Sequence, residues 1–187
     1  MKALDKLLRR WRSDIALRAA PKKLSHVFDI GCDDGYLLKR VANRSAILDG
    51  CDPRLAAQPM TAGSVLLQGC FPSAWEEAGL HRKYDVVFAL AVLEHFSEQD
   101  LIGAARAIAQ MLADTGRLVV TVPAPIVDKI LDVLMFLKLI EGQAVEEHHG
   151  FDPASLVQIF SDHLNLVSHK TFQLGLNHVF VFKKIAS

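Results

Sequence analysis

The sequence predicts an α/β fold in which a largely parallel sheet is covered by helices on both faces. Over most of the 187 residues, short apolar segments that end in glycine or aspartate alternate with segments of helical periodicity. Near the C-terminus the alternation stops, because two apolar segments follow each other across a glycine-containing loop. No linker or repeat divides the chain, so one domain over residues 1–187 is expected. We therefore expect a Rossmann-like three-layer sandwich with a seven-stranded, mostly parallel sheet and an antiparallel final strand.

The first half of the chain is expected to supply an N-terminal helix and four strands. Leu4, Leu8, Trp11 and Ile15 recur at helical spacing and Pro21 ends the pattern, which predicts a helix over residues 1–20. The elements that follow are a strand at 26–31, a helix at 36–43, strands at 46–52 and 64–69, a helix at 72–79 and a strand at 84–90.

The second half adds three helices and three strands. Ser97 followed by Asp100 resembles a capping box, which predicts a helix over residues 97–112. Asp152 as N-cap and Pro153 at the first helical position predict another over 152–163. The remaining elements are strands at 116–122, 164–172 and 178–184, and a very apolar helix at 125–140.

The charged residues are unevenly distributed. Lysine plus arginine and aspartate plus glutamate both number 21, so the formal net charge is zero, which disfavours a uniformly basic nucleic-acid-binding protein. Residues 1–23, however, hold eight basic and two acidic residues, which leaves 13 basic and 19 acidic residues in the remainder. A basic N-terminal helix with this excess would cover an acidic cleft or meet an anionic membrane or partner.

Membrane-spanning and secreted classes are not expected. No 18 consecutive apolar residues without a charge occur, and Arg9, Arg10 and Arg12 interrupt the apolar residues of the N-terminal segment. Three cysteines, none in a CxxC pair, predict neither a disulfide framework nor a metal site. We expect a cytoplasmic location.

The end of the first predicted strand reads VFDIGCDDG over residues 27–35. Gly31 lets the backbone turn sharply at the sheet edge where ligands bind in this fold class. Asp52 ends the next strand, 23 residues after Asp29, which suits a carboxylate that holds ribose hydroxyls. A dinucleotide would require GxGxxG, whereas Asp33 and Asp34 would repel a pyrophosphate. A nucleoside cofactor with a cationic sulfonium and ammonium is therefore preferred to NAD.

This segment resembles the first motif of class I S-adenosylmethionine-dependent methyltransferases. Four further segments resemble motifs of that family and occur in the same order along the chain. They are GCDP (50–53), YDVVFALAVLEHF (84–96), LADTGRLVVTVP (112–123) and HHGFDPASLVQIF (148–160). The last is similar to the ubiquinone-biosynthesis branch. The resemblance implies S-adenosylmethionine as cofactor, S-adenosylhomocysteine as product, and methyl transfer to a small-molecule acceptor.

The resemblance also implies three groups of cofactor-binding residues. Those near the methionine part are Asp29, Gly31, Cys32, Asp33 and Gly35. Those that hold the ribose and line the adenine pocket are Asp52, Pro53, Cys70 and Phe71. Those that lie beneath the sulfonium are Ala89 and Leu90.

Two departures from the family pattern leave a second function open. Asp33 stands where the family has its middle glycine, and its side chain could crowd the methionine moiety or pair with its ammonium. Cys70 replaces an acid that often binds the adenine amino group, and a thiol is a poor acceptor. The alternative is a non-catalytic binding or partner subunit of methyltransferase fold with weakened cofactor binding.

The catalytic residues are less defined than the cofactor site. His95 and His149 are candidates for a base or a substrate-facing group, because imidazole titrates near neutral pH. Residues 89–92 read ALAV rather than the Asn/Asp-Pro-Pro-aromatic tetrad of base methylation, which disfavours nucleic acid as substrate. Residues 124–150 are predicted to form an apolar lid that would suit an apolar acceptor or contact a membrane surface.

Overall fold

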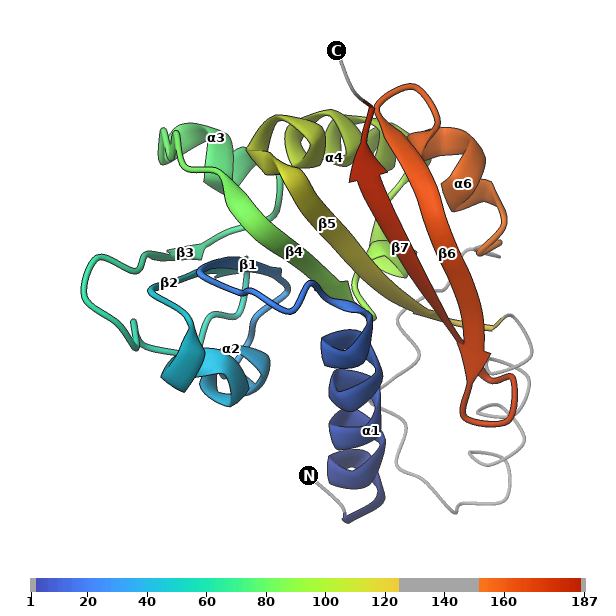
Figure 1. Ribbon diagram of the computed structural model, residues 1–187, viewed down its shortest axis with the longest axis horizontal. Coiled ribbons are helices and arrows are strands. Elements are labelled where there is room, and N and C mark those ends of the chain that lie inside the picture. The colour runs from blue at the N-terminus through green and yellow to red at the C-terminus, as the bar shows by residue number, and fades with distance from the viewer. Residues whose placement is uncertain (1–2, 125–151, 186–187) are drawn as a thin grey trace.

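A computed structural model describes residues 3–124 and 152–185, which form one sheet with helices on both faces (Figure 1). The strand order is β3-β2-β1-β4-β5-β7-β6. β7 pairs antiparallel with both of its neighbours, while the other neighbouring strands pair in parallel. The strands are β1 (His26–Ile30), β2 (Ile47–Asp52), β3 (Leu66–Gln68), β4 (Tyr84–Leu90), β5 (Leu112–Pro123), β6 (Leu164–Phe172) and β7 (Asn177–Lys184). The predicted fold class is confirmed.

The helices divide between the two faces of the sheet. One face is covered by α1 (Ala3–Ala19) and α2 (Tyr36–Val41), which is followed by a 3₁₀ turn, η1 (Ala42–Arg44). The other carries α3 (Ser73–Glu77), α4 (Glu98–Met111) and α6 (Ser155–Phe160), and a second 3₁₀ turn, η2 (Leu93–His95), follows β4.

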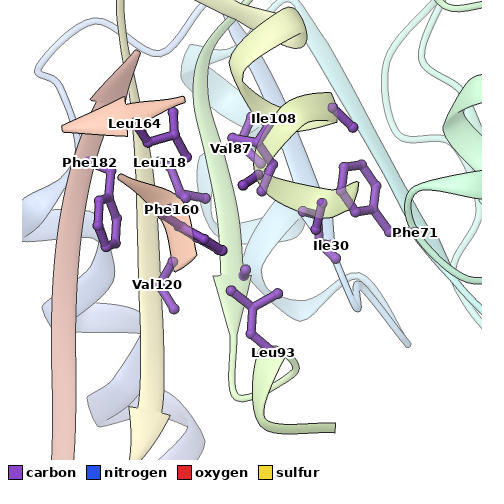
Figure 2. Packing of buried hydrophobic residues seen from close by; sticks show 14 of the residues in the cluster. Ile30, Phe71, Val87, Leu93, Ile108, Leu118, Val120, Phe160, Leu164 and Phe182 are labelled. Carbon is purple, nitrogen blue, oxygen red and sulfur yellow. The ribbon is translucent and has the colours of Figure 1, made fainter. Parts of the chain in front are cut away.

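Each face buries its own hydrophobic cluster. Figure 2 shows Ile108 and Phe160 directed at side chains of β4, β5 and β7 on the α4–α6 face. Because β4 is covered on both sides, Val86 and Phe88 join the opposite cluster. This double burial explains why β4 is a continuous apolar run in the sequence.

A buried carboxylate connects the strands on one side of the sheet. Asp49 of β2 is fully buried and accepts hydrogen bonds from the Tyr84 hydroxyl at 2.7 Å and the Val65 amide at 2.7 Å. The Arg82 guanidinium donates to it at 2.9 Å. These donors compensate the cost of burying the charge and tie β2 to the start of β4 across the intervening β1.

Most predicted elements are present, but two of those that the structure describes begin three or more residues away from the predicted position. The capping box at Ser97 and Asp100 is confirmed. The strand predicted at 116–122 is longer, because β5 begins at Leu112 and continues through an irregular register beside Tyr84. Asp152 does not cap a helix: it accepts from the Ala154 and Ser155 amides and closes a preceding turn, so α6 begins at Ser155. The helix predicted at 125–140 lies outside the described residues.

The face of α1 that contacts the sheet also differs from the prediction. The apolar stripe places Trp11 with Leu8 and Ile15, yet Trp11 is 42% exposed. Among residues 5–19 of this helix, Ser13 and Ala16 are the buried ones. In the part of the chain that the structure describes, no helix combines the length and apolar character needed to cross a bilayer.

Candidate functional site

The candidate site lies where the strand order reverses. From β1 the sheet continues to β2 and β3 on one side and to β4 and β5 on the other. The connections beyond the carboxyl ends of β1 and β4 therefore diverge, which leaves a crevice at this edge. Two cavities open there, and a third adjoins them.

The cavity beside β2, here called the Asp52 cavity, measures about 620 Å³. Asp52 is largely buried, and both of its carboxylate oxygens accept backbone hydrogen bonds, from Asp33 at 3.1 Å and Arg54 at 2.7 Å. Each oxygen keeps further acceptor capacity, so the group can hold a diol in a fixed orientation. Apolar and sulfur-bearing side chains complete the wall, namely Pro53, Cys70, Phe71, Val92 and Phe96.

The turn after β1 supplies backbone rather than side chains to the site. Gly31 has φ 78°, and a Cβ there would meet Val92 at 3.0 Å. Asp33 has φ 43°, the left-handed region that favours glycine, and its side chain is exposed. Its carbonyl accepts from the Ala56 and Ala57 amides at 3.2 and 3.0 Å, which fixes the turn. The aspartate is thus accommodated in a glycine-like conformation.

A second cavity of about 380 Å³ lies between this turn and α1, and we call it the Arg12 cavity. It shares Gly31 and Asp33 with the Asp52 cavity. Arg12 lines it, and its Nε has no hydrogen-bond partner among the described residues. Burial lowers the pKa of Arg12, and the charge of Glu94 opposes that shift. The cavity therefore presents a poorly solvated cation.

Asp29 brings a carboxyl group to the same cavity. Burial raises the pKa of Asp29 to about 8, with Arg9 opposing and Asp52 adding to the shift. A guanidinium and a carboxyl group thus line one small space, which complements a zwitterion such as the amino-acid end of a ligand.

α1 is held over the Arg12 cavity by an ion pair to the turn. Arg9 makes two hydrogen bonds to the Asp34 carboxylate and lies 4.4 Å from the centre of the Tyr36 ring. The Arg9 hydrogen bond holds the pKa of Asp34 below its usual range. A second pair, Arg40 with Asp14, joins α2 to α1. Asp34, the third aspartate of the first motif, therefore serves to dock the N-terminal helix.

A groove of about 810 Å³, here called the α6 groove, adjoins the Asp52 cavity. The two share His95, Phe96 and Asp100. The remaining wall comes from η2, the N-terminal end of α4, and α6, and carries the carboxylates of Glu94, Glu98, Asp152 and Asp162. A second molecule in this groove would lie next to one in the Asp52 cavity.

The structure brings most of the predicted site residues together. The Arg12 cavity is lined by Asp29, Gly31, Cys32, Asp33 and Leu90. The Asp52 cavity is lined by Gly31, Asp33, Asp52, Pro53, Cys70 and Phe71. Gly35 begins α2 and Ala89 is buried within β4, and neither lines these cavities. His149 lies outside the described residues.

Two basic residues that line the Arg12 cavity were not predicted. Arg9 and Arg12 belong to α1, which the sequence presents as a basic helix with an apolar stripe. Their spacing with Ala16 marks one helical face, but this signal is weak because the face carries charges.

Cys32 and Cys51 are buried, while Cys70 is exposed. Burial raises the pKa of Cys51 to about 12 and also raises that of Cys32, so both thiols stay protonated. All three cysteines are free, and the described residues contain no cluster of three or more groups suited to a metal ion.

Comparisons with known proteins agree with this geometry. The family model of a methyltransferase domain matches residues 3–173. None of the curated proteins matches the chain. Among solved structures, the N-methyltransferase NodS from Bradyrhizobium japonicum WM9 is 16% identical, with coverage of 97% of this chain and 99% of its own and a TM-score of 0.68.

A second NodS structure contains S-adenosyl-L-homocysteine and is 16% identical, with 95% and 87% coverage and a TM-score of 0.66. The magnesium protoporphyrin IX methyltransferase from Synechocystis PCC 6803, also solved with S-adenosylhomocysteine, is 17% identical, with 99% and 88% coverage and a TM-score of 0.63. These likenesses establish the shared fold.

The docking of α1 can be tested with Asp34→Asn. Asparagine keeps the acceptor oxygen for the Tyr36 amide but loses the ion pair with Arg9. Asp34 lines neither cavity, so an effect on ligand binding must act through α1. We expect S-adenosylhomocysteine to bind roughly two- to five-fold more weakly, as suits a partly exposed pair, and α1 amides to exchange faster. Unchanged affinity and exchange would show that the pair does not hold the helix.

Asp29 predicts a pH-dependent affinity. A cationic ammonium needs the ionised carboxylate, whereas Asp29 is largely protonated below its pKa of about 8. The dissociation constant for S-adenosylhomocysteine should therefore rise about ten-fold per pH unit below pH 8. Calorimetry in buffers of different ionisation enthalpy should detect proton release near pH 7.

Asp29→Asn is the matched variant, and it should bind weakly with little pH dependence. Folding stability responds to pH in the opposite direction to ligand affinity: as pH rises, the wild type should bind more tightly but become less stable. Because the folded pKa exceeds the unfolded value, the wild type loses stability as pH rises from about 4 to about 8. The variant lacks this loss, so its melting temperature relative to the wild type should increase over that range. A flat pH profile for the wild type would contradict the assignment.

Proposed function

We propose that this chain, which belongs to the methyltransferase domain family, transfers a methyl group from S-adenosylmethionine to a small-molecule acceptor. The observation that carries the proposal is that the Arg12 and Asp52 cavities meet at Gly31 and Asp33, which line both. One cavity complements a zwitterion and the other complements a ribose beside an apolar wall. A single extended ligand with an amino acid at one end and a nucleoside at the other fits both.

The residues of the two cavities suit this cofactor. Arg12 would bind its carboxylate and Asp29 its ammonium, while Asp52 would accept from the ribose hydroxyls. Phe71 and Pro53 would contact the adenine. S-adenosylmethionine supplies an activated methyl group, so the protein mainly orients the reactants and excludes water.

The α6 groove is the proposed site of the acceptor. An acceptor hydroxyl or amine must lose a proton as it is methylated, and we assign this proton to an imidazole nitrogen of His95, which lines both the groove and the Asp52 cavity. The described wall of the groove carries several carboxylates beside apolar side chains such as Ile102 and Ile159, which favours an acceptor that carries a polar group. One structural neighbour methylates a small molecule, magnesium protoporphyrin IX.

Placement in the ubiquinone-biosynthesis-like branch, and with it a more apolar acceptor, depends on residues 148–160 and on the predicted lid at 124–150. Most of these residues lie outside the described part. A cytoplasmic location is supported by the three free cysteines.

Catalysis is preferred to a purely binding role because both departures from the family motif leave the cavities open. The Asp33 side chain is exposed and its backbone follows a glycine-like path. Cys70 is also exposed at the cavity wall. Both residues line the Asp52 cavity without closing it.

The proposal is tested by calorimetry with S-adenosylhomocysteine. Asp52→Ala should weaken binding by about 30-fold or more, because hydrogen bonds from both ribose hydroxyls to a charged acceptor are lost. Asp114→Ala, which removes an exposed carboxylate paired with Lys184, should leave the affinity unchanged. Absence of binding to the wild type at millimolar ligand would favour the partner-subunit alternative.

The role of His95 is tested separately, once an acceptor is identified by screening. His95→Gln should lower kcat by about 100-fold or more when the acceptor needs a base. His81→Gln, which replaces an exposed histidine that lines none of the three cavities, is the control. Equal kcat for both variants would assign His95 a structural role.

A further inference from the structure

The outward face of α1 carries two large apolar side chains. Leu7 is 59% and Trp11 is 42% exposed, and their four-residue spacing places them on one stripe of the helix. Residues on a different stripe, Arg9 and Arg12, line the Arg12 cavity. The helix therefore has one face in the candidate site and another that presents a leucine and a tryptophan to solvent.

A third apolar side chain projects from the turn between β6 and β7. Leu174 is 99% exposed and has φ 57°, a left-handed conformation that is costly for leucine. Hydrogen bonds from Gly175 to Phe172 at 3.2 Å and from Leu176 to Gln173 at 3.1 Å close the turn. Leu174 is thus held away from the core at a position where glycine or asparagine would be less strained.

This turn is joined to α1. The Gln173 side chain is buried, receives a hydrogen bond from Asn177 at 2.6 Å, and donates to the Leu8 carbonyl at 3.4 Å. Figure 1 shows the β6–β7 turn and the N-terminal half of α1 at the same end of the molecule. The exposed leucines and Trp11 therefore belong to one end of the structure although they are about 160 residues apart in the chain.

Positive charge surrounds these side chains. Lys6, Arg10 and Arg18 are exposed on α1. Asp14, the acid between Trp11 and Arg18 on the same stripe, is paired with Arg40. The first 23 residues hold eight basic and two acidic residues, and although Arg9 and Arg12 line the Arg12 cavity, the outer face of α1 keeps a net positive charge.

We propose that α1 and the β6–β7 turn form a docking face for an anionic lipid bilayer. The face consists of Leu7, Trp11 and Leu174 with the flanking Lys6, Arg10 and Arg18. Tryptophan prefers the lipid–water interface, apolar side chains enter it, and lysine and arginine bind anionic headgroups.

A bilayer is favoured over other polyanions by the kind of side chain that projects. Leucine contributes little to binding of a nucleic acid, which uses aromatic stacking and phosphate contacts. A rigid protein partner would need a matching pocket for each separate projection, whereas a bilayer accepts them without one. This proposal does not depend on the methyl-transfer reaction.

The test is co-sedimentation of the full chain with phosphatidylcholine vesicles that contain or lack phosphatidylserine. We expect binding to the anionic vesicles that weakens at high salt, together with a blue shift of tryptophan fluorescence. Trp11→Ser should lower partitioning by about ten-fold. Arg10→Gln with Arg18→Gln should lower it by about five-fold per charge. Leu174→Ser should lower partitioning by several-fold. Because this variant keeps Trp11, its binding can still be followed by tryptophan fluorescence.

Matched controls separate docking from general surface effects. Val167→Ser replaces a residue that is 49% exposed on β6, and Arg106→Gln with Lys183→Gln removes two exposed charges elsewhere. These variants should bind like the wild type, and all variants should keep the wild-type melting temperature. The proposal is overturned if anionic vesicles are not bound at low salt, if the Trp11 and Leu174 variants bind like the wild type, or if the charge variants lose affinity for single-stranded RNA but not for vesicles.

Discussion

The pairing of β1 with both β2 and β4 is the constraint on which the site depends. Ile30 is in register with Cys51 on one side and Ala89 on the other, so these strands end near the same level. The Gly31 and Cys32 amides donate to the Cys51 carbonyl at 2.9 and 3.2 Å, which directs the following turn toward β2. The Asp33 amide can then reach Asp52. One pattern of strand pairing thus brings both ends of the extended ligand site together.

The two halves of this site differ in rigidity. Asp52 is fixed by backbone hydrogen bonds from a turn that is itself held by the sheet. Arg12 is carried on a helix whose docking relies on partly exposed ion pairs, which contribute little free energy each. The Asp52 cavity is therefore preformed, whereas the Arg12 cavity can widen through small displacements of α1.

The sequence was sufficient for the parts of the structure that depend on local pattern. β4 and β6 have the predicted bounds, because a run of apolar residues or a hairpin fixes them. The face of α1 could not be predicted in the same way. Periodicity indicates which residues share a stripe, but not which stripe faces the sheet. The stripe with Arg9 and Arg12 lies at the sheet edge, because a basic face there meets the acidic turn after β1. The contact between Arg9 and Asp34 joins residues 25 positions apart, and neither motif nor spacing indicates it.

Asp33, which departs from the family motif, and its neighbour Asp34 have different roles in the structure. Asp33 contributes its backbone to the site and Asp34 contributes its side chain to α1. The zero net charge of the chain is therefore a separation of charge between a basic helix and an acidic body. Only part of that helix's excess faces the body, because Arg9 and Arg12 turn inward while Arg10 and Arg18 are exposed. Basic residues, a leucine and a tryptophan on the outer face of α1 do not contribute to the closing of an acidic cleft. The composition of this outer face therefore needs an explanation separate from the docking of the helix.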